Sequence, residues 1–169
     1  IEQVIREVSK LDLTLTDADD VHDLLLSVGA QTFDQLAGRV TDAAALTSWL
    51  ETLVNHRRIY TIKFKDGKRY AAAEDAARYR DALGLVHPPG LPTSFLEEVA
   101  DPLGDLVMRY ARTHGPFRAE TLAAYLQVGV GVIRTVLKQK LREARLVFGE
   151  FLPDGHEQEW CSADVMRRI

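Results

Sequence analysis

A short proline-rich segment constrains the fold of this chain more than any other feature. Between His87 and Pro92 the sequence has three prolines and one glycine within six residues. Proline lacks the amide hydrogen that a helix needs, so this segment predicts an extended linker, which we place at residues 87–97. Because the same order of predicted elements occurs before and after this linker, we expect two small domains in tandem.

The first copy, residues 17–86, begins with three predicted helices. The acidic run that starts at Asp17 suits a helix N-terminus, and Gly29 suits the end of the same helix. Thr32 and Asp42 are N-cap residue types, and each precedes apolar residues at helical spacing. These two residues therefore predict the starts of the second and third helices.

A hairpin is predicted to follow these helices. Residues 60–65 alternate between apolar and polar types, which is the period of a half-buried strand. The pair Asp66-Gly67 is typical of a two-residue hairpin turn, and residues 68–70 supply the returning strand. Three helices followed by a hairpin predict a winged helix, and residues 73–83 predict one more helix that leads into the linker.

The second copy, residues 98–169, repeats this order. Asp101-Pro102 predicts the start of its first helix, because proline is favoured in the first helical turn, and Gly115-Pro116 predicts the end. Residues 119–126 and 129–144 predict two further helices. Residues 146–151 and 157–161 predict two strands joined by a turn at Pro153-Asp154-Gly155. Ser162 predicts the cap of a last helix, which runs from residue 162 onward.

The whole pattern predicts a fold that is mainly α with small β-hairpins (α+β), built as two tandem winged-helix domains. Apolar residues at helical spacing in residues 1–16 predict a helix that belongs to a preceding module. The chain begins at Ile1, and we expect it to be a piece of a longer protein.

Composition excludes several classes of protein. With 46% apolar and 27% charged residues, the chain is not intrinsically disordered, and it has no apolar run long enough to span a membrane. One cysteine, Cys161, cannot form an internal disulfide, and the five histidines lack metal-ligand spacing. A formal net charge of −4 argues against a dedicated duplex binder, although local basic patches decide nucleic-acid contact.

The third helix of the second copy has the most informative basic patch. Four basic residues fall within an arc of about 80° on this helix, whereas an apolar set occupies another arc that can face the core. In helix-turn-helix geometry the helix before the wing enters the major groove. We therefore expect nucleic-acid contact from the basic set, and the alternative is an ordinary solvated face. The basic set is Arg134, Lys138, Arg142 and Arg145; the apolar set is Val130, Ile133, Leu137, Leu141 and Ala144.

The first hairpin and its flanks are also basic, with Arg57, Arg58, Lys63, Lys65, Lys68 and Arg69. These residues are candidates for phosphate contact, and the alternative is edge protection, since lysines on an exposed strand discourage aggregation. The third helix of the first copy contains Asp42 and Glu51 and no basic residue before Arg57. We do not expect that helix to enter a groove.

No residue pattern predicts catalysis. Gly67-Lys68 lacks the upstream glycine and the following Ser or Thr of a phosphate loop, so no cofactor is expected in this chain. Cys161 on a predicted buried strand is expected to act as a small hydrophobe, and Glu157 and Glu159 are expected to face solvent. Trp49 and Trp160 are predicted to be core anchors and not base-stacking platforms.

Several stretches resemble the large helicase-related (Lhr) proteins of bacteria. They are Arg57-Arg58-Ile59, residues 67–84, residues 101–107, residues 109–117, residues 149–155 and Glu159-Trp160-Cys161. The resemblance implies a parent that is a superfamily 2 ATP-dependent helicase, which translocates 3′ to 5′ on single-stranded DNA. It also implies that the ATPase core, with its ATP and Mg²⁺, lies upstream, and that this chain is part of a C-terminal winged-helix extension. The family's motor motifs match nothing here, and no catalytic residue carries over.

Three hypotheses follow from these observations. The leading one is a non-catalytic tandem winged-helix segment of an Lhr-type helicase. Its expected partners are single-stranded or duplex DNA or an RNA:DNA hybrid, bound weakly and without sequence preference, and neighbouring domains of the same polypeptide. The second is a structural or oligomerising module that docks on protein and has no nucleic-acid contact. The third is a glycosylase-like activity, which no residue constellation supports. We expect no membrane partner and a location in the bacterial cytosol with the nucleoid.

Overall fold

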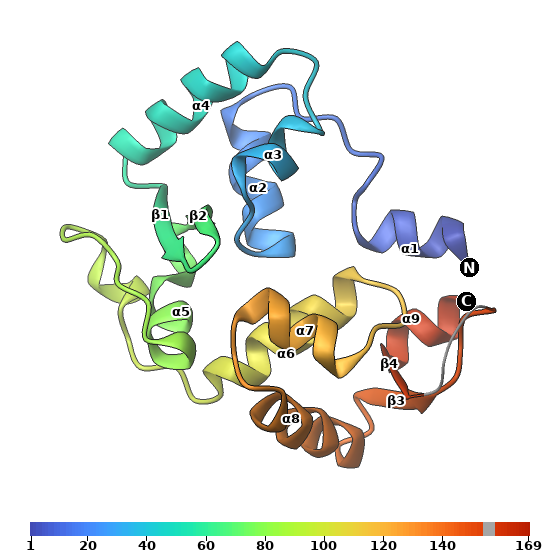
Figure 1. Ribbon diagram of the computed structural model, residues 1–169. Helices are drawn as coiled ribbons and strands as arrows, with labels where there is room; N and C mark the ends of the chain where they lie inside the picture. Colours follow the sequence, from blue (N-terminus) through green and yellow to red (C-terminus); the bar gives the residue numbers. More distant parts are fainter. Residues whose placement is uncertain (154–157) are drawn as a thin grey trace. The chain divides into compact units, whose positions relative to one another are not determined.

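The computed structural model describes residues 1–153 and 158–169, and the chain forms two compact units. One unit comprises residues 12–102, and the other comprises residues 1–11 together with 103–169. Each unit contains three helices followed by an antiparallel hairpin (Figure 1). This arrangement confirms the predicted α+β class with two winged helices.

The helices of the first unit begin where the sequence places their caps. Helix α2 (Ala18–Val28) has Asp17 as its N-cap, α3 (Phe33–Ala37) has Thr32, and α4 (Ala43–Asn55) has Asp42. Each of these side chains accepts a hydrogen bond from a backbone N–H in the first turn, which satisfies a donor that the helix itself cannot pair. The three predicted helix starts are confirmed.

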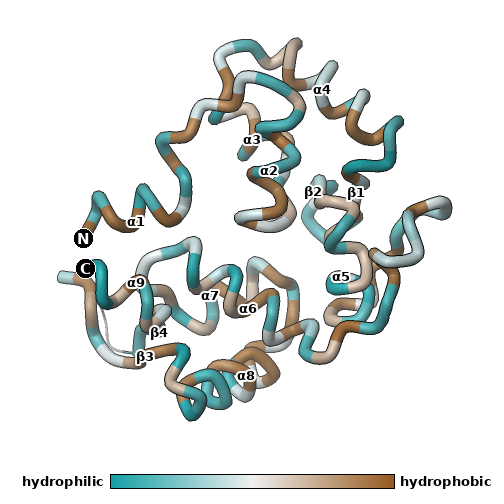
Figure 2. The backbone as a smooth tube through the Cα atoms, turned by 180° about the vertical axis from the view of Figure 1, so that it is seen from behind, coloured by the Kyte–Doolittle hydropathy of each residue, from teal (hydrophilic) through white to brown (hydrophobic). Residues whose placement is uncertain are grey.

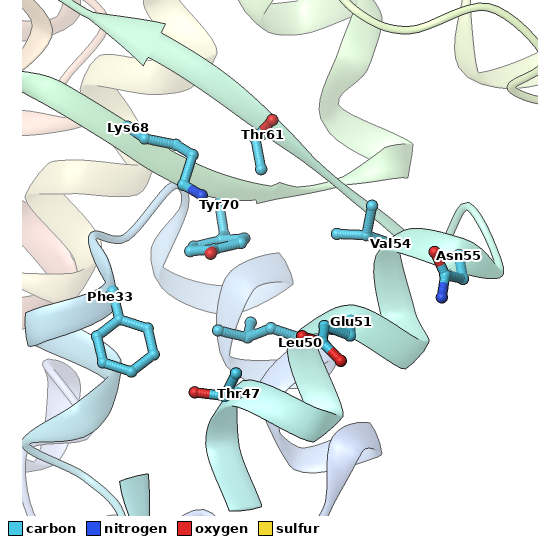
Figure 3. Close-up of a pocket in the computed structure, with 9 residues that line it drawn as sticks. All are labelled: Phe33, Thr47, Leu50, Glu51, Val54, Asn55, Thr61, Lys68 and Tyr70. Carbon is cyan, nitrogen blue, oxygen red and sulfur yellow. The ribbon is translucent and has the colours of Figure 1, made fainter. Parts of the chain in front are cut away.

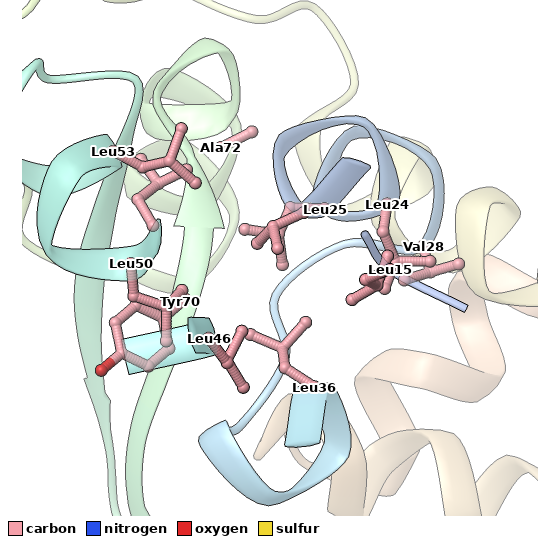
Figure 4. Close-up of a cluster of buried hydrophobic side chains, with 12 residues drawn as sticks. Leu15, Leu24, Leu25, Val28, Leu36, Leu46, Leu50, Leu53, Tyr70 and Ala72 are labelled. Carbon is pink, nitrogen blue, oxygen red and sulfur yellow. The ribbon is translucent and has the colours of Figure 1, made fainter. Parts of the chain in front are cut away.

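The three helices bury one apolar cluster against the hairpin (Figure 4). Leucines dominate it, and Trp49 lies at its margin, only partly buried. The predicted anchoring role of Trp49 is therefore confirmed only in part. The buried members of the cluster are Leu15, Val21, Leu24, Leu25, Val28, Leu36, Leu46, Leu50, Leu53, Ile59, Tyr70 and Ala72.

Strands β1 (Ile59–Phe64) and β2 (Gly67–Ala72) form the first wing. Their register pairs Phe64 with Gly67, so Lys65 and Asp66 form the two-residue loop. The predicted turn at Asp66-Gly67 is one residue too late. Gly67 has φ 140°, a conformation that side chains rarely adopt, and it still belongs to the strand.

A short helix closes the first unit behind the wing. The 3₁₀ turn η1 (Ala73–Asp75) leads into α5 (Ala76–Leu83), which ends at the left-handed Gly84. The Tyr79 hydroxyl accepts a hydrogen bond from the Ala30 backbone N–H at 2.8 Å, which fixes α5 to the start of the α2–α3 loop. The proline-rich segment then runs as irregular chain with one 3₁₀ turn, η2 (Thr93–Phe95).

The second unit repeats this order of elements. Its helices are α6 (Pro102–Thr113), α7 (Ala119–Leu126) and α8 (Val130–Arg142); its strands are β3 (Leu146–Gly149) and β4 (Glu159–Ser162); and α9 (Ala163–Arg168) follows the wing. Ser162 is the N-cap residue of α9, although its side chain makes no capping hydrogen bond. The expected turn at residues 153–155 lies partly outside the described residues, and Glu157 lies wholly outside them.

Helix α1 (Glu2–Val8) packs within the second unit. A Cβ atom on Gly115 would lie 2.5 Å from the Ile5 side chain, so a larger residue would force that side chain to shift. Arg168 on α9 also reaches the Glu7 carboxylate at 2.5 Å. The predicted helix exists, but it packs on residues 103–169 and not on the sequence next to it. The predicted domain limits at residues 16, 86 and 97 stay predictions.

The second wing corrects one expectation and confirms two. Glu159 is only 4% exposed, because its carboxylate accepts hydrogen bonds from the Phe151 and Leu152 backbone N–H groups at 2.7 and 3.0 Å. The prediction that it faces solvent is wrong. Trp160, 6% exposed, and Cys161, fully buried, are core residues as predicted. Burial, with a smaller contribution from Glu159, raises the pKa of the Cys161 thiol to about 11.

Candidate nucleic-acid interface

Helix α8 presents three of the four predicted basic residues on one exposed face. Ile133 and Leu137 are fully buried and anchor the helix in the core of its unit. Arg134, Lys138 and Arg142 follow one another at intervals of four residues and are all exposed. Figure 2 shows the resulting alternation of hydrophobic and hydrophilic residues along α8. The helix thus has one apolar face that packs in the core and one exposed basic face.

Arg145 does not share this face. The helix ends at Arg142, Ala144 takes a left-handed conformation with φ 60°, and the Arg145 N–H donates to the Lys140 carbonyl at 3.0 Å. The chain has therefore changed direction before Arg145, which lies at the start of the second wing. The prediction that it belongs to the α8 face is wrong.

The predicted apolar face of α8 also needs a correction. Leu141 is 38% exposed and Ala144 is exposed, whereas Lys140 is only 2% exposed. The Lys140 ammonium lies 3.4 Å from the Glu143 carboxylate. A lysine can bury its aliphatic chain among apolar residues while the ammonium pairs with a carboxylate, so a basic residue fills the last core position.

The exposed basic residues differ in how far acidic neighbours neutralise them. The Arg134 guanidinium lies 2.5 Å from the Glu120 carboxylate, and Arg145 lies 3.8 Å from Glu143. The pKa of Glu120 is lowered by its own backbone N–H and then by Arg134. Within the part of the chain that the structure describes, no acidic residue forms an ion pair with Lys138 or Arg142. These two residues are the most available for phosphate.

Helix α6 has two further arginines outside the predicted set, Arg109, which is half-buried, and Arg112, which is exposed. Burial lowers the pKa of Arg112, and the positive charges of Arg145 and Arg109 lower it further. The carboxylates of Asp105 and Asp164 act in the opposite direction and raise this pKa. Arg109 and Arg112 are three residues apart on α6, which is the helical signal that sequence reasoning missed.

The first wing places its lysines on the face that looks toward α4. Thr61 pairs with Tyr70 and Lys63 pairs with Lys68, so these four side chains lie on one face of the hairpin. The Lys68 ammonium lies 5.1 Å from the centre of the Tyr70 ring. Two exposed lysines directly opposite each other repel, and an anionic partner would relieve this repulsion. Lys65 lies in the exposed hairpin loop.

Arg69 lies on the other face of the hairpin and is only 5% exposed. Its guanidinium carbon is 3.7 Å from the centre of the Phe64 ring, and Asp66 lies 3.8 Å from the guanidinium. Strand alternation turns Arg69 away from Lys63 and Lys68, so it does not share their exposed face, and its contact with phosphate stays a prediction.

The two arginines before the first wing have structural contacts. Arg58 donates to Asp19 at 2.6 Å, and its second terminal nitrogen lies 3.1 Å from His22 Nδ1. Arg57 is exposed and left-handed with φ 57°, and a Cβ on Gly90 would lie 2.8 Å from its guanidinium carbon. Arg58 thus contacts side chains of α2, and the exposed Arg57 lies beside Gly90.

The two winged helices align position by position. Helices α4 and α8 have the same length, and each residue of α8 lies 87 positions after its counterpart in α4 (43 to 130). The buried residues Leu46, Leu50 and Leu53 correspond to Ile133, Leu137 and Lys140. The exposed basic residues of α8 correspond to Thr47, Glu51 and Asn55. One face therefore occurs twice, basic in α8 and neutral to acidic in α4.

The described residues contain no group of three or more His, Cys, Asp or Glu side chains that could hold a metal ion. None of the described helices has the length and apolar character needed to cross a membrane.

Comparisons with known proteins identify the family. A family model of the winged-helix domain of the large helicase-related protein matches residues 1–98. The "Lhr helicase/ probable uracil glycosylase" of Mycolicibacterium smegmatis is 40% identical over 151 residues, which cover 89% of this chain and 10% of that protein. The "Lhr helicase/uracil glycosylase" of Escherichia coli is 36% identical over 174 residues, which cover 99% of this chain and 11% of that protein. This chain, which spans about a tenth of the length of these two relatives, belongs to the family of large helicase-related proteins.

Proposed function

We propose that this chain is a non-catalytic tandem winged-helix segment of an Lhr-type ATP-dependent 3′–5′ DNA helicase. In this proposal α8 contacts the sugar–phosphate backbone of nucleic acid and holds it in place relative to the neighbouring domains of the same polypeptide. The motor, with its ATP and Mg²⁺, belongs to the remainder of the longer protein. The bacterial origin of both relatives supports a role in the cytosol, where the nucleoid lies.

The exposed face of α8 is the observation that carries this proposal. Arg134, Lys138 and Arg142 lie on the helix that a winged helix presents to nucleic acid, opposite buried Ile133 and Leu137. Guanidinium and ammonium groups contact phosphate oxygens without reading bases. We therefore propose weak, salt-sensitive binding to single-stranded DNA, duplex DNA or an RNA:DNA hybrid, with little dependence on sequence.

The charge of the exposed face of α8 supports nucleic acid over protein as its partner. A docking surface for protein would be expected to have an apolar centre, yet the middle of this face is Lys138. The two relatives are also named for a uracil glycosylase. That activity is said of proteins about ten times as long, and we propose none of its chemistry for this chain.

Titration of the chain with fluorescently labelled single-stranded and duplex DNA at low salt tests the proposal. We expect binding to both, with affinity that falls steeply as salt rises. The Lys138→Ala/Arg142→Ala variant should bind more weakly, and the matched control Arg167→Ala, an exposed arginine on α9, should behave as wild type. If neither DNA binds, or if the double variant binds as wild type does, the protein-docking alternative takes its place.

A further inference from the structure

A pocket lies between α4 and the first wing (Figure 3). Its volume is about 470 Å³, within the ~300–1,000 Å³ range typical of small-ligand sites. Helix α4 supplies one wall, the hairpin supplies the opposite wall, and Phe33 at the start of α3 adds an aromatic ring. The lining residues are Phe33, Thr47, Leu50, Glu51, Val54, Asn55, Thr61, Lys68 and Tyr70.

The pocket occupies the place where the second winged helix has its basic face. Thr47, Glu51 and Asn55 on α4 correspond to Arg134, Lys138 and Arg142 on α8. The α4 wall therefore offers hydroxyl, carboxylate and amide groups in place of cations. Glu51 repels phosphate, so α4 cannot follow a phosphate backbone as α8 can.

The opposite wall has the complementary chemistry. Lys68 lines the pocket and Lys63 is its cross-strand neighbour on the same hairpin face. Two rings, Phe33 and Tyr70, line the pocket between this cationic edge and the α4 wall (Figure 3). An occupant is thus expected to have a flat apolar part, hydrogen-bonding edges and an anionic end that points to the wing.

We propose that this pocket binds one unstacked base of single-stranded nucleic acid. The base contacts the half-buried Phe33 ring and the small part of Tyr70, 9% exposed, that lines the pocket. The adjacent phosphates contact Lys63 and Lys68. Aromatic contact accepts any base, because every base has a π face. Glu51 adds a preference for bases with an exocyclic amino group, because a carboxylate accepts a hydrogen bond from cytosine N4 and repels the O4 of thymine.

This proposal rests on the proposed function only because both treat nucleic acid as the ligand. The residues of the pocket lie in the unit of residues 12–102, whereas α8 lies in the other unit. It assigns the first winged helix to single strands and leaves the phosphate contacts of α8 unchanged. Duplex DNA, whose bases are stacked and paired, cannot place a base in the pocket without base flipping.

The test compares 12-nucleotide oligomers of deoxycytidine and deoxythymidine at pH 7.5, with binding measured by fluorescence anisotropy. We expect the chain to bind the deoxycytidine oligomer about 5-fold or more tightly, as for one base-edge hydrogen-bonding contact. The Glu51→Gln variant should lose this preference, because an amide pairs with both bases. Glu97→Gln, an exposed glutamate elsewhere in the same unit, removes the same charge and should keep the preference.

Loss of the aromatic ring gives an independent readout. Phe33→Leu keeps an apolar side chain at a half-buried position, and it should lower affinity for both oligomers about 5-fold or more. Phe148→Leu, at an exposed ring of the second unit, is the matched control and should leave the affinity for both oligomers unchanged. Circular dichroism of each variant shows whether the fold is kept. If Phe33→Leu unfolds the unit, amide chemical shifts of the wild type decide, and they should move at Thr61 and Asn55 when the deoxycytidine oligomer is added.

Equal affinity of the wild type for the two oligomers would overturn the proposal, as would an unchanged preference in Glu51→Gln or shift changes confined to α8. The proposed function fails in a different way. If Lys138→Ala/Arg142→Ala binds as wild type does but the deoxycytidine preference persists, the pocket stands and the α8 interface falls. If the double variant weakens binding and no preference exists, the α8 interface stands and the pocket falls.

Discussion

Replacement of Trp160 by alanine should strongly destabilise the second winged helix. The indole is 6% exposed, its ring centre lies 4.5 Å from that of Phe148, and its backbone pairs with Phe117. Truncation of a buried tryptophan to alanine costs about 3–5 kcal/mol through lost burial and the cavity left behind. A domain of about 80 residues is stable by roughly 4–12 kcal/mol, so this loss removes about a quarter or more of its stability.

Urea denaturation followed by circular dichroism measures this change. Trp49, the second of the two tryptophans, lies in the unit of residues 12–102, and its fluorescence identifies the transition of that unit. Trp160→Phe keeps an aromatic ring and should cost clearly less than Trp160→Ala. A loss below about 1 kcal/mol for Trp160→Ala, together with lost DNA binding, would refute the reasoning, because the indole would then be a stacking platform and not a core anchor.

Two further predictions concern the second wing. Because burial raises the pKa of the Cys161 thiol to about 11, the native protein should react with iodoacetamide at pH 8 far more slowly than the urea-unfolded chain, and equal rates would contradict this burial. Glu159→Ala should lower the free energy of unfolding by about 2–3 kcal/mol, because two backbone N–H groups lose a charged acceptor, whereas Glu159→Gln keeps one oxygen and should cost less. Thermal melting of the two variants checks this order.

The sequence was sufficient to predict the helix starts because each has a local chemical cause. Asp17, Thr32 and Asp42 accept hydrogen bonds from their own helices, so neighbouring residues alone decide these positions. The first wing was predicted for the same reason, since alternation and a tight turn are local properties. The family resemblance and three of the four basic residues of the predicted α8 set could likewise be found from the sequence.

Features that depend on distant residues could not be predicted. Glu159 is buried because the backbone of Phe151 and Leu152 folds back onto it, and the alternation of a short strand does not reveal such an acceptor. Helix α1 packs beside Gly115, which is far away in the sequence. Arg145 leaves the α8 face because Ala144 is left-handed, a conformation that is uncommon for alanine.

Two correspondences between the two winged helices can be recognised only from the structure. Ala144 corresponds to Arg57, and both are left-handed residues between the third helix and the wing. The backbone pairing of Gln31 with Tyr70 corresponds to that of Phe117 with Trp160. The corresponding positions in the two copies have different residue types. A comparison of the two sequences therefore cannot reveal these correspondences.

The salt dependence of DNA binding tests the central claim, that α8 contacts phosphates, most directly. Each lost phosphate contact reduces the slope of log K against log salt by about 0.7–0.9. Lys138 and Arg142 are exposed and without an ion pair among the described residues, so Lys138→Ala/Arg142→Ala should flatten the slope by roughly 1.4–1.8. The wing variant Lys63→Ala/Lys68→Ala, measured with duplex DNA, is the comparison. A slope that is unchanged in the α8 variant and flattened in the wing variant would contradict the account, because the first wing would then be the phosphate-binding surface.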